Sequence, residues 1–301
     1  MIKLKSIQTG SINFDLDCGK QHENFTYKDT TLSKATLILG DEGKHRISLT
    51  IYDTLFIIAN YLLQTKKIKL PFFTPMISPQ NKVNTVFLVD SNNSLVEIDM
   101  KNEKVKSTTD LNLQINFAYI TDDNIISHLY VLNKRGLLTY LRSLLKDFNI
   151  NIGFNSDDTI TFNGVTYDDF EGFVKSSAKV RGIIKGLIAV IYMQLEDSLV
   201  LLEQLENGID YETLKELWVR FLKTTNGRII TTSNNAELLQ NRDLFNLCNI
   251  QICDGNDVYK LSGIDGIEMI DDLYKAYISG KLGGVPDYTR MIFDQFIDET
   301  K

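Results

Sequence analysis

Three short stretches of the sequence contain residues whose types and spacing could do chemistry. The first, Gly40–Ser48, reads GDEGKHRIS and lies between a short apolar run and a long apolar segment. Phosphate-binding loops combine glycines, which let backbone N–H groups approach phosphate, with a lysine for the phosphates and a hydroxyl for magnesium. On its own this stretch is a weak match, because the motif fails at its later positions.

The other two stretches are apolar runs that end in polar residues. Leu199–Asp210 reads LVLLEQLENGID, and Ile229–Leu239 reads IITTSNNAELL. Taken singly, each of the three stretches also fits a structural role. The first fits a polar turn, the second a buried parallel strand with a solvated end, and the third a strand-to-helix turn with Ser233 as its cap.

Together and in this order, the three stretches resemble the ATP-binding-cassette ATPases of the RecF and SMC-like group. Stand-alone bacterial ATPases of DNA repair and phage defence belong to the same group. The family pattern reads roughly GxNGSGKS, hhhhDEPENGLH and hhhTTHSxELL, where this sequence has GDEGKHRIS, LVLLEQLENGID and RIITTSNNAELL. Ser176-Ser177-Ala178 falls where the family has its LSSG signature. The resemblance covers most of residues 1–261 and depends on the ordered set, especially LENG and TTSNNAELL.

The resemblance implies an α/β fold with a P-loop NTPase core of the ABC type over residues 1–261. Within that core it implies an antiparallel β-subdomain at 82–133 and a lateral helical insertion at 134–177. Residues 262–301 are then a helical C-terminal extension, for which the sequence predicts helices around Glu268–Ile278 and Tyr288–Glu299.

The residue patterns predict elements that suit this fold. Ser48–Gln64 is apolar on nearly all sides, which is typical of a buried helix. Apolar residues alternate strictly through Leu111–Tyr119, which predicts an antiparallel strand with one wet face. From residue 178 onward helices and strands alternate, which predicts parallel pairing through crossovers. These elements are the helices Ala178–Gln194 and Tyr211–Lys223, capped by Asp210, and the strands Leu199–Leu202 and Arg228–Thr232.

The first stretch departs from the family pattern at the residues that hold phosphate and magnesium. Aligned without a gap, Arg46 falls on the loop lysine and Ile47 on the magnesium-binding serine or threonine. His45 replaces a glycine whose missing Cβ lets the backbone approach phosphate. Arginine does not substitute neutrally for lysine in a tight cradle, and Ile47 has no oxygen. Ser48 comes one residue late, about 100° round a helix.

The remaining stretches have lost the groups that run the reaction. Glu203 falls on the Asp that holds magnesium through water, and Gln204 on the Glu that activates the attacking water. A glutamine can orient water but cannot take its proton. Ser233 replaces the switch histidine, and Ala178 the signature glycine. Because phosphoryl transfer is positioning plus electrostatic stabilisation, we expect these joint changes to abolish hydrolysis.

The resemblance and these losses together predict a pseudo-ATPase, with no catalytic residue and no metal site expected. Its vestigial nucleotide site comprises Gly40, Asp41, Glu42, Gly43, Lys44, His45, Arg46, Ile47 and Ser48, which would hold ATP and magnesium weakly. The expected role is that of a scaffold or regulator in a DNA-maintenance or phage-defence complex. The expected partners are a second copy of the chain or an active ATPase, together with a nuclease or effector protein.

Two other functions stay open at this point. One is a slow or nucleotide-gated ATPase that uses Arg46 and Glu203, and the other is a protein- or DNA-binding module that binds no nucleotide. The net charge of −7 and the pI near 5.1 argue against a general electrostatic grip on nucleic acid or anionic lipid. A local basic patch for DNA is not excluded by net charge.

The cysteines and the apolar runs suggest a compartment. The three cysteines are odd in number and far apart, so they predict neither a disulfide framework nor a zinc site and fit a reducing compartment. The longest apolar stretch, Gly186–Leu195, is about half of the ~20 residues that a membrane span needs. We therefore expect a cytoplasmic protein without a membrane partner.

Overall fold

The computed structural model describes most of the chain, including the strands of a central sheet. The described residues are 3–9, 12–22, 24–28, 30–40, 43–64, 85–89, 95–99, 104–106, 116–155, 159–162, 164–195, 198–255 and 257–285. Predicted features outside these ranges, such as the helix Tyr288–Glu299, lie outside the described residues.

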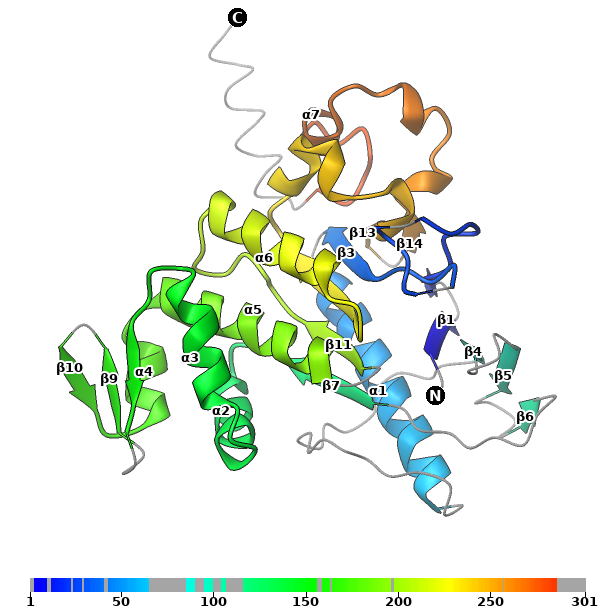
Figure 1. Ribbon diagram of the computed structural model, residues 1–301. Helices are drawn as coiled ribbons and strands as arrows, with labels where there is room; N and C mark the ends of the chain where they lie inside the picture. Colours follow the sequence, from blue (N-terminus) through cyan, green and yellow to red (C-terminus); the bar gives the residue numbers. More distant parts are fainter. Residues whose placement is uncertain are drawn as a thin grey trace, which may run out of the picture.

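A six-stranded, mostly parallel sheet forms the centre of this α/β fold (Figure 1), with the strand order β14-β13-β3-β12-β11-β7. Five strands run parallel, and β14 pairs antiparallel with β13 at one edge. Every residue of β3, β7, β11 and β12 is buried, as expected of parallel strands covered on both faces. The strands are β3 (Ala35–Gly40), β7 (Asn116–Ile120), β11 (Ser198–Leu202), β12 (Arg228–Ser233), β13 (Ile250–Asp254) and β14 (Asp257–Lys260).

Helices cover both faces of this sheet (Figure 1). The helix α1 (Gly43–Gln64) lies on one face, and α5 (Ala178–Leu195) and α6 (Tyr211–Lys223) lie on the other. Neighbouring residues of β11 point to opposite sides. Leu201 belongs to the apolar cluster of α1, and Leu202 belongs to the cluster of α5 and α6. The sheet is thus held between two apolar cores.

Two smaller antiparallel sheets flank the centre. One has the order β2-β1-β4-β5-β6 and the other the order β10-β9-β8. Their strands are β1 (Lys3–Thr9), β2 (Ile12–Asp15), β4 (Thr85–Val89), β5 (Leu95–Asp99), β6 (Lys104–Lys106), β8 (Ile152–Phe154), β9 (Ile160–Phe162) and β10 (Val165–Tyr167). The remaining helices are α2 (Ile125–Lys134), α3 (Leu138–Lys146), α4 (Phe170–Lys175), α7 (Leu273–Ile278) and the 3-10 turns η1 (Glu237–Gln240), η2 (Arg242–Leu244), η3 (Leu247–Asn249), η4 (Leu261–Gly263) and η5 (Ile267–Met269).

The predicted elements of the second half are confirmed. The helices expected at 178–194 and 211–223 are α5 and α6, and the strands at 199–202 and 228–232 are β11 and β12, paired in parallel. The Asp210 carboxylate accepts a hydrogen bond from the Thr213 backbone N–H at 2.9 Å and so caps α6 as expected. Local patterns were sufficient here because each element has its own start or stop signal.

The prediction for Leu111–Tyr119 was wrong in its described part. Residues 116–120 form β7, which pairs in parallel with β11 at the edge of the central sheet and has no wet face. Phe117 and Tyr119 pack with α1, whereas Ala118 and Ile120 pack on the other face. Both faces of the strand therefore pack in apolar cores. The face that carries Ala118 was interpreted as the wet one because alanine is small and only weakly apolar.

The C-terminal extension is less helical than expected in its described part. The single helix predicted over 268–278 is split into η5 and α7. Asp272 interrupts it, because its carboxylate accepts from the Lys275 backbone N–H at 2.8 Å and caps α7 instead. The proposed boundaries at 82–133, 134–177 and 262–301 stay predictions.

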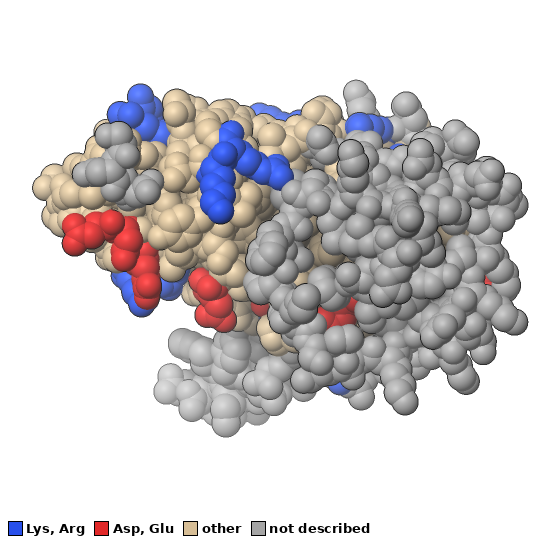
Figure 2. Space-filling view, turned by 90° about the horizontal axis from the view of Figure 1, so that it is seen from below, with Lys and Arg blue, Asp and Glu red and all other residues tan. Residues whose placement is uncertain are grey.

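The described surface has no single dominant charge on the face seen from below (Figure 2). Basic and acidic side chains stand there in separate small groups between neutral residues. Among the described helices, none combines the length and the apolar character needed to cross a membrane.

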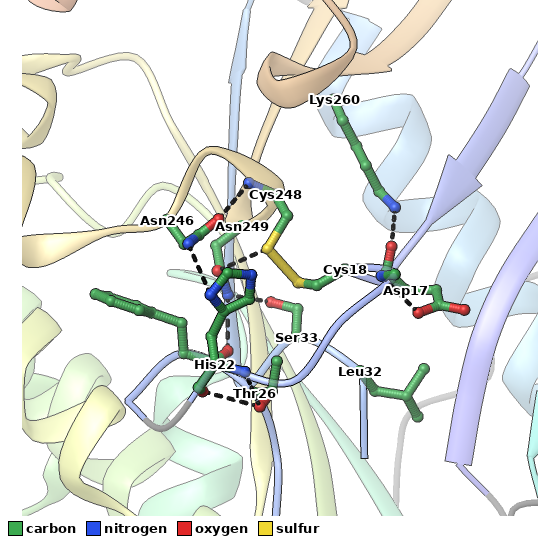
Figure 3. Close-up of a disulfide and its surroundings, with 12 residues drawn as sticks. Asp17, Cys18, His22, Thr26, Leu32, Ser33, Asn246, Cys248, Asn249 and Lys260 are labelled. Atoms are coloured by element: carbon green, nitrogen blue, oxygen red, sulfur yellow. Dashed lines mark hydrogen bonds between the residues drawn. A yellow bond between two sulfur atoms is a disulfide. The ribbon is translucent and has the colours of Figure 1, made fainter. Parts of the chain in front are cut away.

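The cysteine prediction was wrong for one pair. Cys18 and Cys248 form a disulfide, with their Cα atoms 5.2 Å apart although 230 positions separate them in the sequence (Figure 3). Cys248 lies in η3, directly before β13, and Cys18 lies in the connection that leads into β3; these two strands pair in the central sheet. Spacing along the sequence gave no sign of this contact, since the pairing of β3 with β13 creates it. Cys253 is buried and is not part of this disulfide.

Candidate functional site

Residues from all three predicted stretches meet at the carboxyl edge of the central sheet. Gly40 ends β3, Ser233 ends β12, and Glu203 directly follows β11. Because β3, β12 and β11 are parallel neighbours, their carboxyl ends lie on one edge, where α/β folds place ligands. The side chains of Asp41 and Glu42 lie outside the described residues. The exposed Arg46 turns to the far side of β3, and its Nη2 lies 3.5 Å from the Gly255 carbonyl oxygen.

Glu203 is the centre of this edge and is only 7% exposed. Its Oε2 lies 2.9 Å from His45 Nδ1, and its Oε1 accepts a hydrogen bond from the Tyr119 hydroxyl. Burial raises the pKa of the Glu203 carboxyl, while the bonds from Tyr119 and His45 oppose that rise. Burial and the charge of Glu203 raise the pKa of the Tyr119 hydroxyl. Both carboxylate oxygens are therefore engaged within the protein.

The loop between β3 and α1 is shorter than a phosphate-binding loop. That motif has four residues between its two glycines, whereas only Asp41 and Glu42 separate Gly40 from Gly43. Gly40 has φ of +149°, and a Cβ at this position would clash with the carbonyl oxygen of Cys253. The glycine is thus needed for the close approach of β13, a requirement that has no connection with phosphate.

The helix α1 starts earlier than the ungapped alignment implied, and this start changes the positions of Lys44 and Arg46 within the helix. Since α1 begins at Gly43, Lys44 and not Arg46 is its second residue. The Lys44 side chain is 6% exposed, and its Nζ donates to the Gly40 carbonyl oxygen at 2.9 Å. Ile47 and Ser48 are buried, and Ile47 packs in the apolar cluster of α1. The loop lysine therefore binds the last residue of β3, the strand that precedes it.

A second polar network lies beside Glu203 and fixes Gln204. The backbone of Gln204 has φ of +49°, a left-handed conformation that a non-glycine residue adopts only under constraint. Its N–H donates to Thr232 Oγ1 at 3.0 Å, and its carbonyl accepts from Lys185 Nζ at 2.8 Å. Lys185 is fully buried and also pairs with Asp122 Oδ1 at 2.8 Å. Burial lowers the pKa of the Lys185 ammonium, and Asp122 opposes that effect.

Three residues of this edge were not predicted from the sequence, namely Lys185, Asp122 and Tyr119. One signal was present, because Lys185 stands alone in the long apolar face of the helix AKVRGIIKGLIAVIYMQL. A lysine at such a position needs a buried acceptor, but its partner Asp122 lies 63 residues away and cannot be identified from spacing. Tyr119 looked like one more apolar residue of a strand.

The LENG segment has structural contacts within the chain. Glu206 Oε1 accepts from the Asn234 backbone N–H at 2.7 Å, which joins the ends of β11 and β12. The Asn207 side-chain amide donates to Asp122. Gly208 has φ of +81°, and a Cβ there would clash with the Ala178 carbonyl oxygen. The LENG segment thus packs on the first turn of α5.

Of the signature-like residues, Ser176 and Ser177 directly precede α5, and Ala178 begins this helix and lies against Gly208 of the LENG segment. Ser176 and Ala178 are exposed, and Ser177 Oγ accepts from the Val180 backbone N–H at 3.3 Å. Ser233 serves the turn after β12, where its Oγ accepts from the Asn235 backbone N–H at 2.9 Å. A local capping role therefore accounts for Ser233.

The side chains of this edge fit ATP and magnesium poorly. The Lys44 ammonium is directed to Gly40, both oxygens of Glu203 have partners, and Ile47 is in an apolar core. In the part of the chain that the structure describes, no group of three or more His, Cys, Asp or Glu side chains is placed to hold a metal ion. No reaction step through a magnesium nucleotide follows from this arrangement.

Comparison with known proteins adds no relative to this picture. No protein-family model matches the sequence, and no curated protein matches it.

Proposed function

We propose that this chain is a non-hydrolysing relative of the RecF and SMC-like ATPases, a pseudo-ATPase that serves as a scaffold or regulator in a larger complex. The observation that carries the proposal is the state of Glu203. A carboxylate that holds magnesium through water needs oxygens open to the site, whereas those of Glu203 bind Tyr119 and His45. The short loop and the inward Lys44 support the same conclusion.

The contacts that hold the strand ends together are present at this site, while the side chains at the positions that react in the family bind other residues of the chain. Lys185, Asp122 and the LENG segment hold the ends of β7, β11 and β12 together. A frame that is held by internal hydrogen bonds and a buried ion pair suits a protein that presents a fixed surface to partners. The expected partners are a second copy of the chain or an active ATPase of the same group, in DNA maintenance or phage defence.

Phosphate release from ATP by the purified full chain tests the loss of hydrolysis. With magnesium, we expect the wild-type rate to equal that of the Glu203→Gln variant, which keeps the shape of the side chain and removes its charge. Magnesium-dependent release that falls at least about tenfold in Glu203→Gln would overturn the proposal, since removal of one essential group from a working site costs that much or more.

One observation favours a second candidate, a nucleotide-gated switch. Gly43 and Lys44 occupy the first turn of α1, the position from which a loop lysine reaches phosphate. Titration calorimetry with ATP separates the two candidates. Binding that is lost in Lys44→Ala and retained in Arg46→Ala favours the switch, and absence of binding in all three proteins favours the scaffold.

A further inference from the structure

We propose that the Cys18–Cys248 disulfide is a redox-responsive latch, which a dithiol can open without unfolding the protein. The latch holds the outer part of the connection between β2 and β3, residues 18–22, against η3. This inference rests on the disulfide and its surroundings (Figure 3), and it is independent of the proposed function.

The two bonded cysteines differ in their access to solvent. Cys18 is half-buried, whereas Cys248 is 4% exposed. An incoming thiolate therefore reaches the Cys18 sulfur first, and Cys248 is the leaving group. The Cys248 Sγ lies 3.3 Å from Asn249 Oδ1, so the released thiol has a hydrogen-bond acceptor in place. The buried Cys248 thiol that reduction produces therefore has a hydrogen-bond partner.

The exchange balances with a dithiol as the reductant. Its first thiolate attacks Cys18 Sγ, the Cys18–Cys248 bond breaks, and Cys248 leaves as a thiolate that takes up a proton. The second thiol of the reductant then attacks the sulfur of the reductant that is bonded to Cys18. This step releases Cys18 as a thiol and closes the disulfide of the reductant. Two electrons and two protons pass from the dithiol to the protein.

Hydrogen bonds hold the surrounding fold without the disulfide. The Asn249 amide nitrogen donates to the Phe25 carbonyl at 3.0 Å, to Ser33 Oγ at 2.5 Å and to the Ala35 carbonyl at 2.9 Å. These bonds anchor the inner end of the connection to the end of η3, directly before β13, and to the start of β3. The pairing of β3 with β13 is a further, separate restraint. Opening the disulfide therefore leaves the central sheet intact.

The outer part of the connection has weaker restraints. The Asn246 amide nitrogen lies 3.2 Å from His22 Nδ1, and the Gly19 backbone N–H donates to Asp17 Oδ1 at 2.9 Å. Gly19 and Lys20 are exposed. Without the covalent link to η3, this segment depends on partly exposed hydrogen bonds, which open at low free-energy cost.

Thiol counting and hydrogen exchange on the purified full chain, with and without dithiothreitol, test the latch. One of the three cysteines, Cys253, lies outside the disulfide, so the denatured protein should show one thiol before reduction and three after it. Amide exchange in peptides that cover residues 18–22 should rise about tenfold on reduction, while peptides of β11 remain much slower to exchange because the central sheet stays folded. Reoxidation of the same sample should restore slow exchange.

Two variants serve as matched controls. Cys18→Ser should exchange fast over residues 18–22 with or without dithiothreitol, and Cys253→Ala should keep the full response. Three thiols before reduction, unchanged exchange over residues 18–22, or exchange in β11 as fast as that of residues 18–22 on reduction would each overturn the latch. The reoxidation experiment uses the wild type alone, so the test stands even if Cys18→Ser does not fold.

Discussion

Glu203 shows at the scale of one residue how burial converts a reactive group into a structural one. Its carboxyl pKa lies above the ordinary 4.5 because burial disfavours the charged form. Since the folded state then binds the proton more tightly than the unfolded state, the stabilising effect is complete below about pH 4.5. It is lost as the pH rises through the folded-state pKa.

The Glu203→Gln variant tests this linkage, because the amide cannot titrate. Between about pH 5 and about pH 8, we expect the free energy of unfolding of the wild type to fall relative to that of the variant. The expected change is about 1.4 kcal/mol for each unit by which the pKa of Glu203 in the folded state exceeds that in the unfolded state. Urea unfolding at both pH values measures the change. A difference between the two proteins that does not vary with pH would contradict the raised pKa.

Lys185 is the residue on which the second network depends. Lys185→Met removes the buried cation and leaves Asp122 with Asn207 as its partner, so we expect a loss of about 3 kcal/mol in the free energy of unfolding. The double variant Lys185→Met/Asp122→Asn should recover part of this loss.

Lys179→Met is the matched control for Lys185. It lies on the same helix, and its salt bridge with Asp210 is exposed on both sides, so we expect a change within about 1 kcal/mol. Equal losses in Lys179→Met and Lys185→Met, measured by urea unfolding, would mean that burial of the ion pair has no special role.

The contact of α5 with the LENG segment belongs to the scale of elements. A Cβ on Gly182 would lie 2.5 Å from the Asn207 carbonyl oxygen, so the glycine sets how closely the helix approaches the segment. We expect Gly182→Ala to lower the free energy of unfolding by about 1–3 kcal/mol. Gly263→Ala, where a Cβ meets nothing within 4 Å, should change it by less than about 0.5 kcal/mol. Thermal unfolding of both variants measures these changes. Equal effects of the two substitutions would contradict the close approach of α5 to the LENG segment.

The elements that the sequence predicts well are those with local signals. Asp210 at the start and Asn226-Gly227 after the end fixed α6, and the buried runs of β11 and β12 fixed two parallel strands. The start of α1 and the place of β7 were wrong for a common reason. Gly43 was interpreted as a loop glycine and Tyr119 as part of an antiparallel strand, although contacts with distant strands decide both.

At the scale of the whole molecule, the meeting of the three stretches at the carboxyl edge of the sheet could be predicted. The hydrogen bonds between side chains at this edge could not. Parallel order alone brings the three polar stretches together. The partners of Glu203, however, come from α1 and β7, more than 80 residues away in the sequence, and no pattern within one stretch identifies them. The disulfide was missed for the same reason.

The disulfide also makes a prediction about overall stability. It closes a loop of 230 positions, and cross-links of this length reduce the entropy of the unfolded chain by an amount worth about 3–5 kcal/mol. We expect dithiothreitol to lower the midpoint of urea unfolding of the wild type, and to leave that of Cys18→Ser unchanged. An equal response of both proteins would assign the effect to something other than this bond.

The position of the two bonded cysteines has a consequence for proteolysis. A single cut at any exposed site between residues 18 and 248 produces two fragments that stay covalently joined. Such nicked molecules migrate with the mass of the intact chain on a non-reducing gel and separate only after a thiol is added. Damage to the backbone over most of the sequence therefore does not by itself divide the protein into pieces.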